Sequence, residues 1–234
     1  LVPCSDEVLR QDKVVCSGIR KEVNDLHGGC WSLTEQGILY TARNSAFSFI
    51  DESQGLKGEV LSLIDTPDGL YAGTTTGLYL CTSDRFEKLE GINTTCWQIV
   101  PVPDYPGYLV ATSQGVFYVE NRKIVWKYTN LHTLAVCYSG KSAWVGELDR
   151  LRYFDFDKDA FTQEVSINNP YKILTAKDGT LWVSTLPKCE CFYFLPNDNT
   201  PHKTPMEGTL VTEDDDIYIR GIENTWVWNT QTHS

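Results

Sequence analysis

The sequence predicts an all-β fold, and specifically a β-propeller of six four-stranded blades, on two observations. Aromatic residues are abundant, with 7 Trp, 12 Tyr and 9 Phe against a single Met, and aromatic side chains suit the pleated, half-buried surface of a β-sheet. Short strand-and-turn units also recur about every 36 residues without long helical patterns, which is typical of propeller blades.

The clearest unit is "LSLIDTPDGLYAGTTTGLYLCTSDRFEKLEGI", which runs from Leu61 to Ile92. It alternates four strand-forming segments with short turns, and its first turn is "TPDG". These residues suit a tight hairpin turn, because Gly accepts a positive φ and Pro presets φ. The other units follow the same plan and begin at Cys30, Trp97, Leu134, Tyr171 and Thr209.

The second strand of each unit carries one aromatic or large apolar residue, which anchors the alignment of the units. These residues are Tyr40, Tyr71, Leu109, Trp144, Trp182 and Tyr218. They are spaced 31, 38, 35, 38 and 36 residues apart. Such regular spacing predicts that each anchor occupies the same place in its blade.

The two ends of the chain predict how the ring closes. The last unit supplies three strands, and an open ring would leave an exposed sheet edge. The segment "DKVVCSGI" (12–19) resembles "RFEKLEGI" (85–92), the fourth strand of the clearest unit. We therefore expect the N-terminal strand to complete the C-terminal blade, with residues 1–11 as an arm and residues 12–234 as a single propeller domain. The alternative is a piece of a longer propeller array whose ends match by repeat phase alone.

The charge of the chain argues against two classes of partner. The formal net charge is -11, whereas nucleic-acid phosphates and anionic lipid surfaces attract clustered Lys and Arg. No apolar run reaches the ~20 residues of a membrane helix, so we expect no membrane insertion in this segment. The chain starts at Leu1, which leaves open whether it is a mature form or a fragment.

The eight cysteines do not form a disulfide framework by their spacing. Four lie inside apolar runs and are expected to be buried free thiols: Cys81, Cys96, Cys137 and Cys191. Cys189 and Cys191 lack a second pair at zinc-site spacing, so no metal site is expected. Cys4 and Cys16 are either a disulfide or two reduced thiols, and the single sequon at Asn93 does not decide the compartment.

Three segments resemble the short repeat of the two-component regulator propellers. They are "DGLYAGTTTGLYL" (68–80), "DGTLWVST" (178–185) and, more weakly, "YLVATSQGVFYV" (108–119). Two other units depart from the repeat, with Glu147 in place of its Thr and Arg220 before its Gly. The resemblance implies an extracytoplasmic ligand-sensing module of a bacterial hybrid histidine kinase. Many of these kinases respond to carbohydrate, and the resemblance also implies a periplasmic or extracellular location.

Two other function classes stay open. One is an intracellular interaction scaffold of the WD-repeat type, which reduced cysteines would favour. The other is a propeller enzyme acting on a glycan or lactone, because catalytic groups can converge from several blades without a local motif. The four His residues have no neighbour at metal-ligand spacing, and no phosphate-binding or nucleophile motif is present. No cofactor is therefore expected, and catalysis is the less favoured alternative.

A closed propeller gathers two sets of loops on one face, and these loops carry the candidate binding residues. They are the connections between blades and the turns between second and third strands. The candidates are Trp31, Arg43, Asn44, Thr75, Trp97, Gln114, Glu147, Arg150, Tyr171, Lys188 and Asn224. Aromatic rings offer flat contact area and amide or guanidinium groups orient a ligand, which suits carbohydrate, a peptide or a protein. The alternative for Trp31 and Trp97 is packing between blades.

Overall fold

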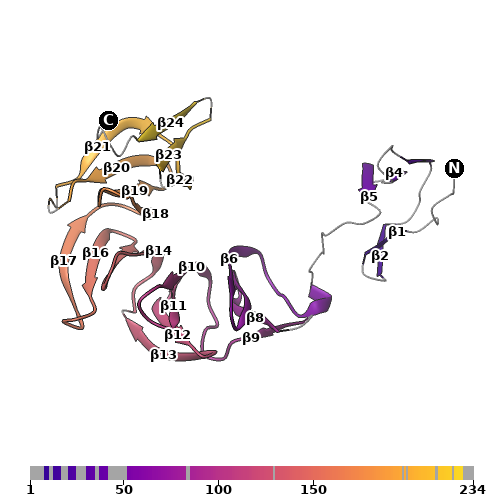
Figure 1. Cartoon of the computed structure of the whole chain (residues 1–234), viewed down its shortest axis with the longest axis horizontal. Helices are drawn as coiled ribbons and strands as arrows, with labels where there is room; N and C mark the ends of the chain where they lie inside the picture. The colour runs from indigo at the N-terminus through magenta and orange to yellow at the C-terminus, as the bar shows by residue number, and fades with distance from the viewer. Residues whose placement is uncertain are drawn as a thin grey trace. The chain divides into compact units, whose positions relative to one another are not determined.

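The structure is a computed structural model, and it divides into two compact units, residues 1–54 and residues 55–234. We describe each unit by itself (Figure 1). The described residues of the first unit are 8–10, 13–16, 21–24, 30–34, 37–41 and 52–54, with only the backbone described in the strands. Those of the second unit are 55–82, 85–128, 130–196, 198, 200–213, 216–222 and 224–228.

The first unit contains two antiparallel sheets. One pairs β1 (Val8–Arg10) with β2 (Lys13–Cys16). The other has the order β3 (Lys21–Asn24), β4 (Cys30–Thr34) and β5 (Gly37–Thr41). A short 3-10 helix, η1 (Glu52–Gln54), ends the unit.

The N-terminal segment predicted to close the ring forms a local hairpin. The segment 12–19 does contain a strand, β2, but this strand pairs with β1, which lies in the expected N-terminal arm. Leu9 pairs with Val14 and Arg10 with Lys13, so a short local hairpin satisfies part of the backbone of β2. Six blades and ring closure therefore stay predictions, as does the division into an arm and one domain.

The second unit contains five antiparallel sheets, each built from strands that are consecutive in the chain. The first sheet comprises β6 (Val60–Thr66), β7 (Gly69–Thr74), β8 (Gly77–Thr82) and β9 (Arg85–Lys88). The second comprises β10 (Cys96–Val102), β11 (Gly107–Thr112), β12 (Gly115–Glu120) and β13 (Lys123–Tyr128). The third comprises β14 (Thr133–Tyr138), β15 (Ser142–Glu147), β16 (Arg150–Asp155) and β17 (Ala160–Ser166).

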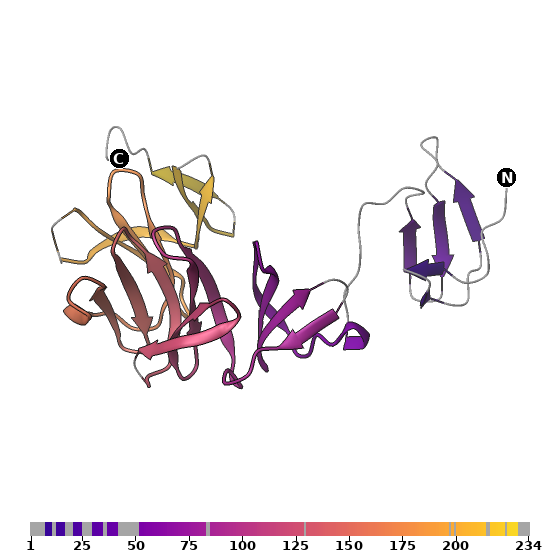
Figure 2. The same ribbon diagram turned by 60° about the horizontal axis from the view of Figure 1, so that its bottom comes forward.

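The last two sheets of this unit are built from the strands nearest the C-terminus. The fourth comprises β18 (Pro170–Thr175), β19 (Leu181–Thr185), β20 (Glu190–Phe194) and β21 (His202–Glu207). The fifth has three strands, β22 (Thr209–Glu213), β23 (Asp216–Arg220) and β24 (Thr225–Trp228). Figure 2 shows this fifth sheet in yellow, following the orange strands of the fourth. Repeated antiparallel sheets with neighbouring strands in sequence order confirm the predicted β-propeller fold.

The predicted anchor residues lie in the second strand of each sheet of this unit. Tyr71, Leu109 and Trp182 are each only 1% exposed, in β7, β11 and β19. Burial of side chains of this size stabilises the fold by roughly 1.5–3 kcal/mol each. The repeat seen in the sequence is therefore a repeat of core positions.

The core of the second unit lies between successive sheets. One cluster, which includes Leu80 and Val110, joins the first sheet to the second. Three further clusters join the second to the third, the third to the fourth, and the fourth to the fifth. Side chains of the first strands add hydrogen bonds across these junctions, from Ile99 N to Ser62 Oγ and from Val136 N to Gln98 Oε1, both at 3.0 Å.

The turn "TPDG" shows how the sequence sets the hairpin geometry. Thr66 Oγ1 donates to Gly69 O at 2.7 Å and accepts from Asp68 N at 3.2 Å, which closes the turn between β6 and β7. Gly69 has φ +124°, and a Cβ there would lie 2.2 Å from Cys81 O on the neighbouring strand. Only Gly fits this position, because both its φ and the close backbone exclude a side chain.

Five described cysteines are free thiols: Cys81, Cys96, Cys137, Cys189 and Cys191. Of the four that the sequence predicts to be buried, Cys96 and Cys191 are buried, whereas Cys81 and Cys137 are half-buried. Cys4 lies outside the described residues, so its pairing with Cys16 stays open.

Candidate ligand-binding site

Backbone hydrogen bonds bring the two predicted sets of loops together on one face of the second unit. Ser113 N donates to Thr95 O at 3.0 Å, which joins a second-to-third-strand turn to a connection between blades. Asn169 N donates to Leu148 O at 2.7 Å, and Gly208 N donates to Cys189 O at 2.8 Å. We call this surface the loop face: among the described residues it comprises the turns 75–76, 113–114, 148–149, 186–189, 221–222 and 224 and the connections 89–95, 130–132, 167–169 and 208.

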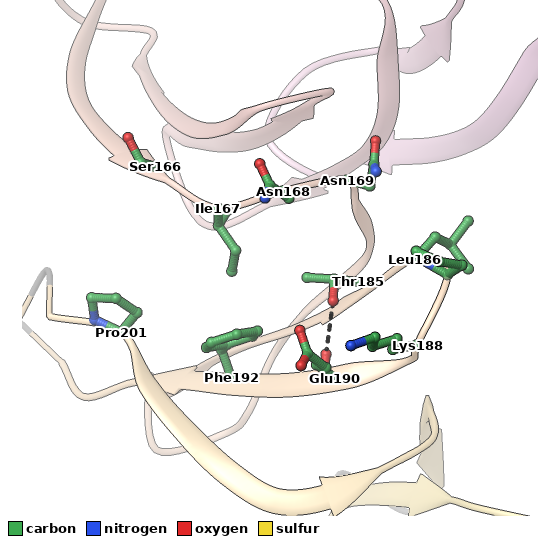
Figure 3. Close-up of a pocket in the computed structure, with 11 residues that line it drawn as sticks. Ser166, Ile167, Asn168, Asn169, Thr185, Leu186, Lys188, Glu190, Phe192 and Pro201 are labelled. Atoms are coloured by element: carbon green, nitrogen blue, oxygen red, sulfur yellow. Dashed lines mark hydrogen bonds between the residues drawn. The ribbon is translucent and has the colours of Figure 1, made fainter.

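A cavity of about 380 Å³ opens on the loop face where the third sheet meets the fourth. This volume lies in the range of roughly 300–1,000 Å³ that small-molecule sites occupy. Figure 3 shows the connection after β17 on one side and the segment from Thr185 to Phe192 on the other. The lining residues are Ser166, Ile167, Asn168, Asn169, Thr185, Leu186, Pro187, Lys188, Glu190, Phe192 and Pro201.

Asn169 holds the two walls of the cavity together through its backbone. Its N–H donates to Leu148 O, and its carbonyl accepts from Leu186 N at 3.1 Å. Its φ is +46°, a left-handed conformation that Asn adopts more readily than most residues other than Gly. The sequence "NNP" therefore provides a connection that can bend sharply just before β18.

The length of the turn 186–189 makes room for the cavity. The corresponding turns in the first three sheets, 75–76, 113–114 and 148–149, have only two residues each. The two additional residues carry Leu186 and Lys188 away from the sheet, and both side chains are exposed. Ile167, which is buried, and Phe192, which is half-buried, form the apolar part of the lining.

Charged side chains lie on one side of the cavity. Lys203 Nζ donates to Glu190 Oε1 at 2.6 Å. This hydrogen bond, with a smaller contribution from the charge of Lys188, holds the pKa of Glu190 below its ordinary value. Glu190 is therefore an ionised carboxylate at neutral pH, and Lys188 presents a second ammonium group to the same cavity (Figure 3).

Of the predicted binding residues, Lys188 is the one that lines this cavity. Thr75 and Gln114 are exposed in two-residue turns of the loop face, and Asn224 is exposed in its last turn. Trp31 lies in β4, where only the backbone is described, and Arg43 and Asn44 lie outside the described residues. The structure thus brings Thr75, Gln114, Lys188 and Asn224 to the predicted face without gathering them at one cavity.

Trp97 and Tyr171 occupy equivalent positions in two blades. The strand register shifts at each of them, between Cys96 and Gln98 in β10 and between Pro170 and Lys172 in β18. Trp97 Nε1 donates to Ser113 Oγ at 3.1 Å, and its ring lies 5.6 Å from the ring of His132. Tyr171 is 42% exposed. The ring of Trp97 therefore packs among loops of the face, whereas Tyr171 is open to solvent.

Glu147 and Arg150 belong to an ion-pair cluster beside the cavity. The side chain of Glu147 is only 1% exposed, and its oxygens lie 3.4 Å from both Arg150 Nε and Arg152 Nη1. Arg150 also pairs with Asp149 at 2.9 Å and with Glu164 at 3.1 Å. The turn 148–149, which this cluster surrounds, accepts the hydrogen bond from Asn169 N. These two residues therefore support the wall of the cavity rather than line it.

Asn168, Asn169, Glu190 and Phe192 are not among the predicted binding residues. Asn168 and Asn169 lie in a connection between blades, but nothing in its composition distinguishes it from other polar loops. One signal is the length of the turn 186–189, which has four residues against two in the first three sheets, although the turn between β23 and β24 is equally long.

No helix among the described residues is both long and apolar enough to cross a membrane. No three His, Cys, Asp or Glu side chains in the described part of the chain are grouped as metal ligands.

No protein-family model matches the sequence. No curated protein matches it either.

Solved structures do resemble the fold. The extracellular domain of the hybrid two-component system BT3049 from B. thetaiotaomicron matches with TM-score 0.66 and 18% identity, over 80% of this chain and 31% of that chain. The corresponding domain of BT4673 from the same organism matches with TM-score 0.65 and 16% identity, over 96% of this chain and 37% of that one. This chain therefore spans about a third of the length of these two structures.

The likeness extends to another class of propeller. The WD40 domain of Neurospora crassa Pan2 matches with TM-score 0.55 and 13% identity, over 76% of this chain and 64% of that chain. At these identities the comparisons establish the propeller fold, in agreement with the resemblance that the sequence repeats show.

Proposed function

We propose that this chain is a non-catalytic ligand-binding propeller that serves as a sensor module and recognises carbohydrate on its loop face. The observation that carries the proposal is the cavity between the connection 167–169 and the turn 186–189. It lies where the sequence places the working face of a propeller, and it combines polar groups with an apolar wall.

The lining of the cavity suits the chemistry of a sugar. The amides of Asn168 and Asn169 and the hydroxyl of Ser166 can donate and accept hydrogen bonds, as sugar hydroxyl groups require. The aromatic ring of Phe192 and the side chain of Ile167 offer apolar contact to the C–H faces of a sugar ring. A few polar groups beside an apolar surface are typical of small-molecule sites.

Two further observations support a binding role. The solved structures with the higher TM-scores, 0.66 and 0.65, are extracellular domains of two-component systems. In the cavity, the carboxylate of Glu190 has a lowered pKa because of Lys203. A general acid at neutral pH needs a raised pKa, so Glu190 does not suit that role. Its carboxylate can instead hold a fixed negative charge in the site.

A thermal-shift screen followed by calorimetric titration against mono- and oligosaccharides tests this function. A bound sugar raises the apparent stability by mass action, by about 2.7 kcal/mol at a ligand concentration of 100 Kd. Asn168→Ala is expected to weaken binding severalfold, because it removes an amide from the cavity wall. Asn130→Ala, in a different connection of the loop face, is the matched control. Absence of binding for every saccharide would overturn the proposal.

A further inference from the structure

The lining of the cavity carries one cation and one anion, Lys188 and Glu190. Glu190 has a partner outside the lining, because the ammonium group of Lys203 lies 2.6 Å from its Oε1. Figure 3 shows the side chain of Lys188 on the same wall of the cavity, beside Glu190. Lys188 is therefore the cation that the lining itself offers to a ligand, on a chain whose formal net charge is -11.

The turn that carries Lys188 is fixed at both ends. Leu186 N donates to Asn169 O at 3.1 Å, and Cys189 O accepts from Gly208 N at 2.8 Å. Cys189 also has a positive φ of 55°, which directs the chain back into β20. The backbone at Lys188 is therefore held in place, so that its ammonium group stays close to the cavity although the side chain itself is exposed.

From this arrangement we infer that the cavity takes an acidic saccharide built from uronic acid, with Lys188 as the residue that pairs with a carboxylate of the ligand. This inference rests on the proposed carbohydrate function and names its ligand class. The fixed ion pair of Glu190 with Lys203 leaves Lys188 as the cation that can accept a new anionic partner. Charge-assisted hydrogen bonds are about twice as strong as neutral ones.

The remaining lining residues fit the rest of such a ligand. The amides of Asn168 and Asn169 can donate to a carboxylate oxygen or to ring hydroxyls. Ile167 on the facing wall and Phe192 on the wall that carries Lys188 leave an apolar surface for the ring (Figure 3). At about 380 Å³ the cavity is at the small end of ligand sites, which favours one or two sugar units over a long polymer.

Matched sugars that differ only at C6 give the sharpest test. α-1,4-Digalacturonate and α-1,4-galactobiose share the same ring and linkage, but only the first carries carboxylates. We expect calorimetric titration to give at least tenfold tighter binding of digalacturonate at low salt, which corresponds to about 1.4 kcal/mol. Raising the ionic strength from about 0.02 M to 0.5 M is expected to reduce this difference severalfold, because Lys188 is exposed to solvent.

Substitutions of Lys188 test whether this residue causes the difference in affinity between the two sugars. Lys188→Met is expected to weaken digalacturonate binding about tenfold and to leave galactobiose binding unchanged, whereas Lys188→Arg retains most of the affinity. Lys123→Met removes the same charge from an exposed position outside the cavity and serves as the control. Since Lys188 is exposed, the melting temperatures of all four proteins without ligand should agree.

The possible results separate this inference from the function on which it rests. If galactobiose binds as tightly as digalacturonate and Lys188→Met changes neither, the acidic-sugar inference is wrong while carbohydrate binding stands. If Lys123→Met lowers digalacturonate affinity as much as Lys188→Met does, the attraction is a general charge effect and the role of Lys188 is overturned. If neither sugar binds and the wider screen is also negative, both proposals fail.

Discussion

Glu147 occupies a position that Thr fills in three other blades. Thr74 and Thr112 end their second strands and donate from Oγ1 to the carbonyl that opens the third strand, at Gly77 and Gly115. Thr185 does the same to Glu190 O at 3.4 Å. The carboxylate of Glu147 cannot donate this hydrogen bond. It forms ion pairs with Arg150 and Arg152 instead. The departure from the repeat therefore replaces a local cap with an ion-pair cluster.

Glu147→Gln is expected to lower the free energy of unfolding by about 2 kcal/mol. Breaking a fully buried pair costs about 3–5 kcal/mol, but here both arginines are partly exposed and keep Glu164 as a partner. Urea denaturation measures the change. Glu164→Gln, at a side chain that is 52% exposed, should cost less than about 1 kcal/mol. Equal costs for the two variants would show that burial of Glu147 does not govern the cluster.

The thiol of Cys96 makes the free energy of unfolding depend on pH in the alkaline range. Burial raises its pKa from 9.0 to about 12. The folded state thus favours the neutral thiol, and the resulting stability is intact below pH 9 and lost as the pH rises from 9 toward 12. The difference in unfolding free energy between the native sequence and Cys96→Ala is expected to shrink by about 2 kcal/mol between pH 8 and pH 10.5.

Urea denaturation of both proteins at the two pH values checks this. Tyr71, whose pKa burial raises to about 12, titrates in the same way in each protein, so the difference isolates Cys96. A difference that stays constant with pH would mean that the thiol is not desolvated in the folded chain.

At the scale of strands and turns, the second strands could be predicted from the sequence because two independent signals mark them: strand-forming side chains and a preceding turn. Tyr71, Leu109 and Trp182 are buried, Trp144 and Tyr218 are half-buried, and each of these anchors follows a turn with Gly or Asp. The strands β1 and β3 give weaker signals: "VLR" is only three residues long, and "KEVN" contains a single apolar residue. Short strands of this kind are decided by their neighbours rather than by their own residues.

The candidate site was less predictable than the fold, and turn length explains why. The loop face follows from strand order alone, so the sequence could indicate this surface, and its role in binding stays a prediction. Which part of that face is hollow depends on how far the turn 186–189 extends beyond the two-residue turns of other blades. The contribution of Phe192 depends on which face of β20 borders the preceding sheet, and a single sequence does not reveal that.

The junction between the third and fourth sheets depends on a small residue in β15. A Cβ at Gly146 would lie 2.7 Å from Pro170 O and 3.1 Å from Pro170 Cγ and Ile173 Cδ1. Gly146→Ala is expected to lower the free energy of unfolding by about 1–3 kcal/mol, because the first strand of the next blade must move away. Ser184 holds the equivalent position in β19, next to the strand end, and already carries a Cβ there.

Ser184→Ala is therefore the matched control and should change stability by clearly less than Gly146→Ala. Urea denaturation of the two variants gives the comparison. If Gly146→Ala is as stable as the native sequence, the two sheets do not pack as closely as the backbone distances indicate.

At the scale of the whole molecule, closure of the ring stays a prediction with a direct truncation test. Residues 12–19 resemble a fourth strand, and the fifth sheet has three strands among the described residues. If that segment completes the last blade, deletion of residues 1–19 is expected to lower the melting temperature by several degrees. Deletion of residues 1–11 alone keeps the segment and should cost less. Equal melting temperatures for the two truncations would exclude closure by this strand.

The measurement that tests the binding face most directly is amide hydrogen–deuterium exchange with and without saturating digalacturonate. Ligand in the cavity should slow exchange in residues 166–169 and 186–190, because these segments form its two walls. The turns 103–106, 139–141 and 176–180, at the opposite ends of the strands, should be unchanged. Protection of those opposite turns, or no protection in either set while the sugar is bound, would contradict the account.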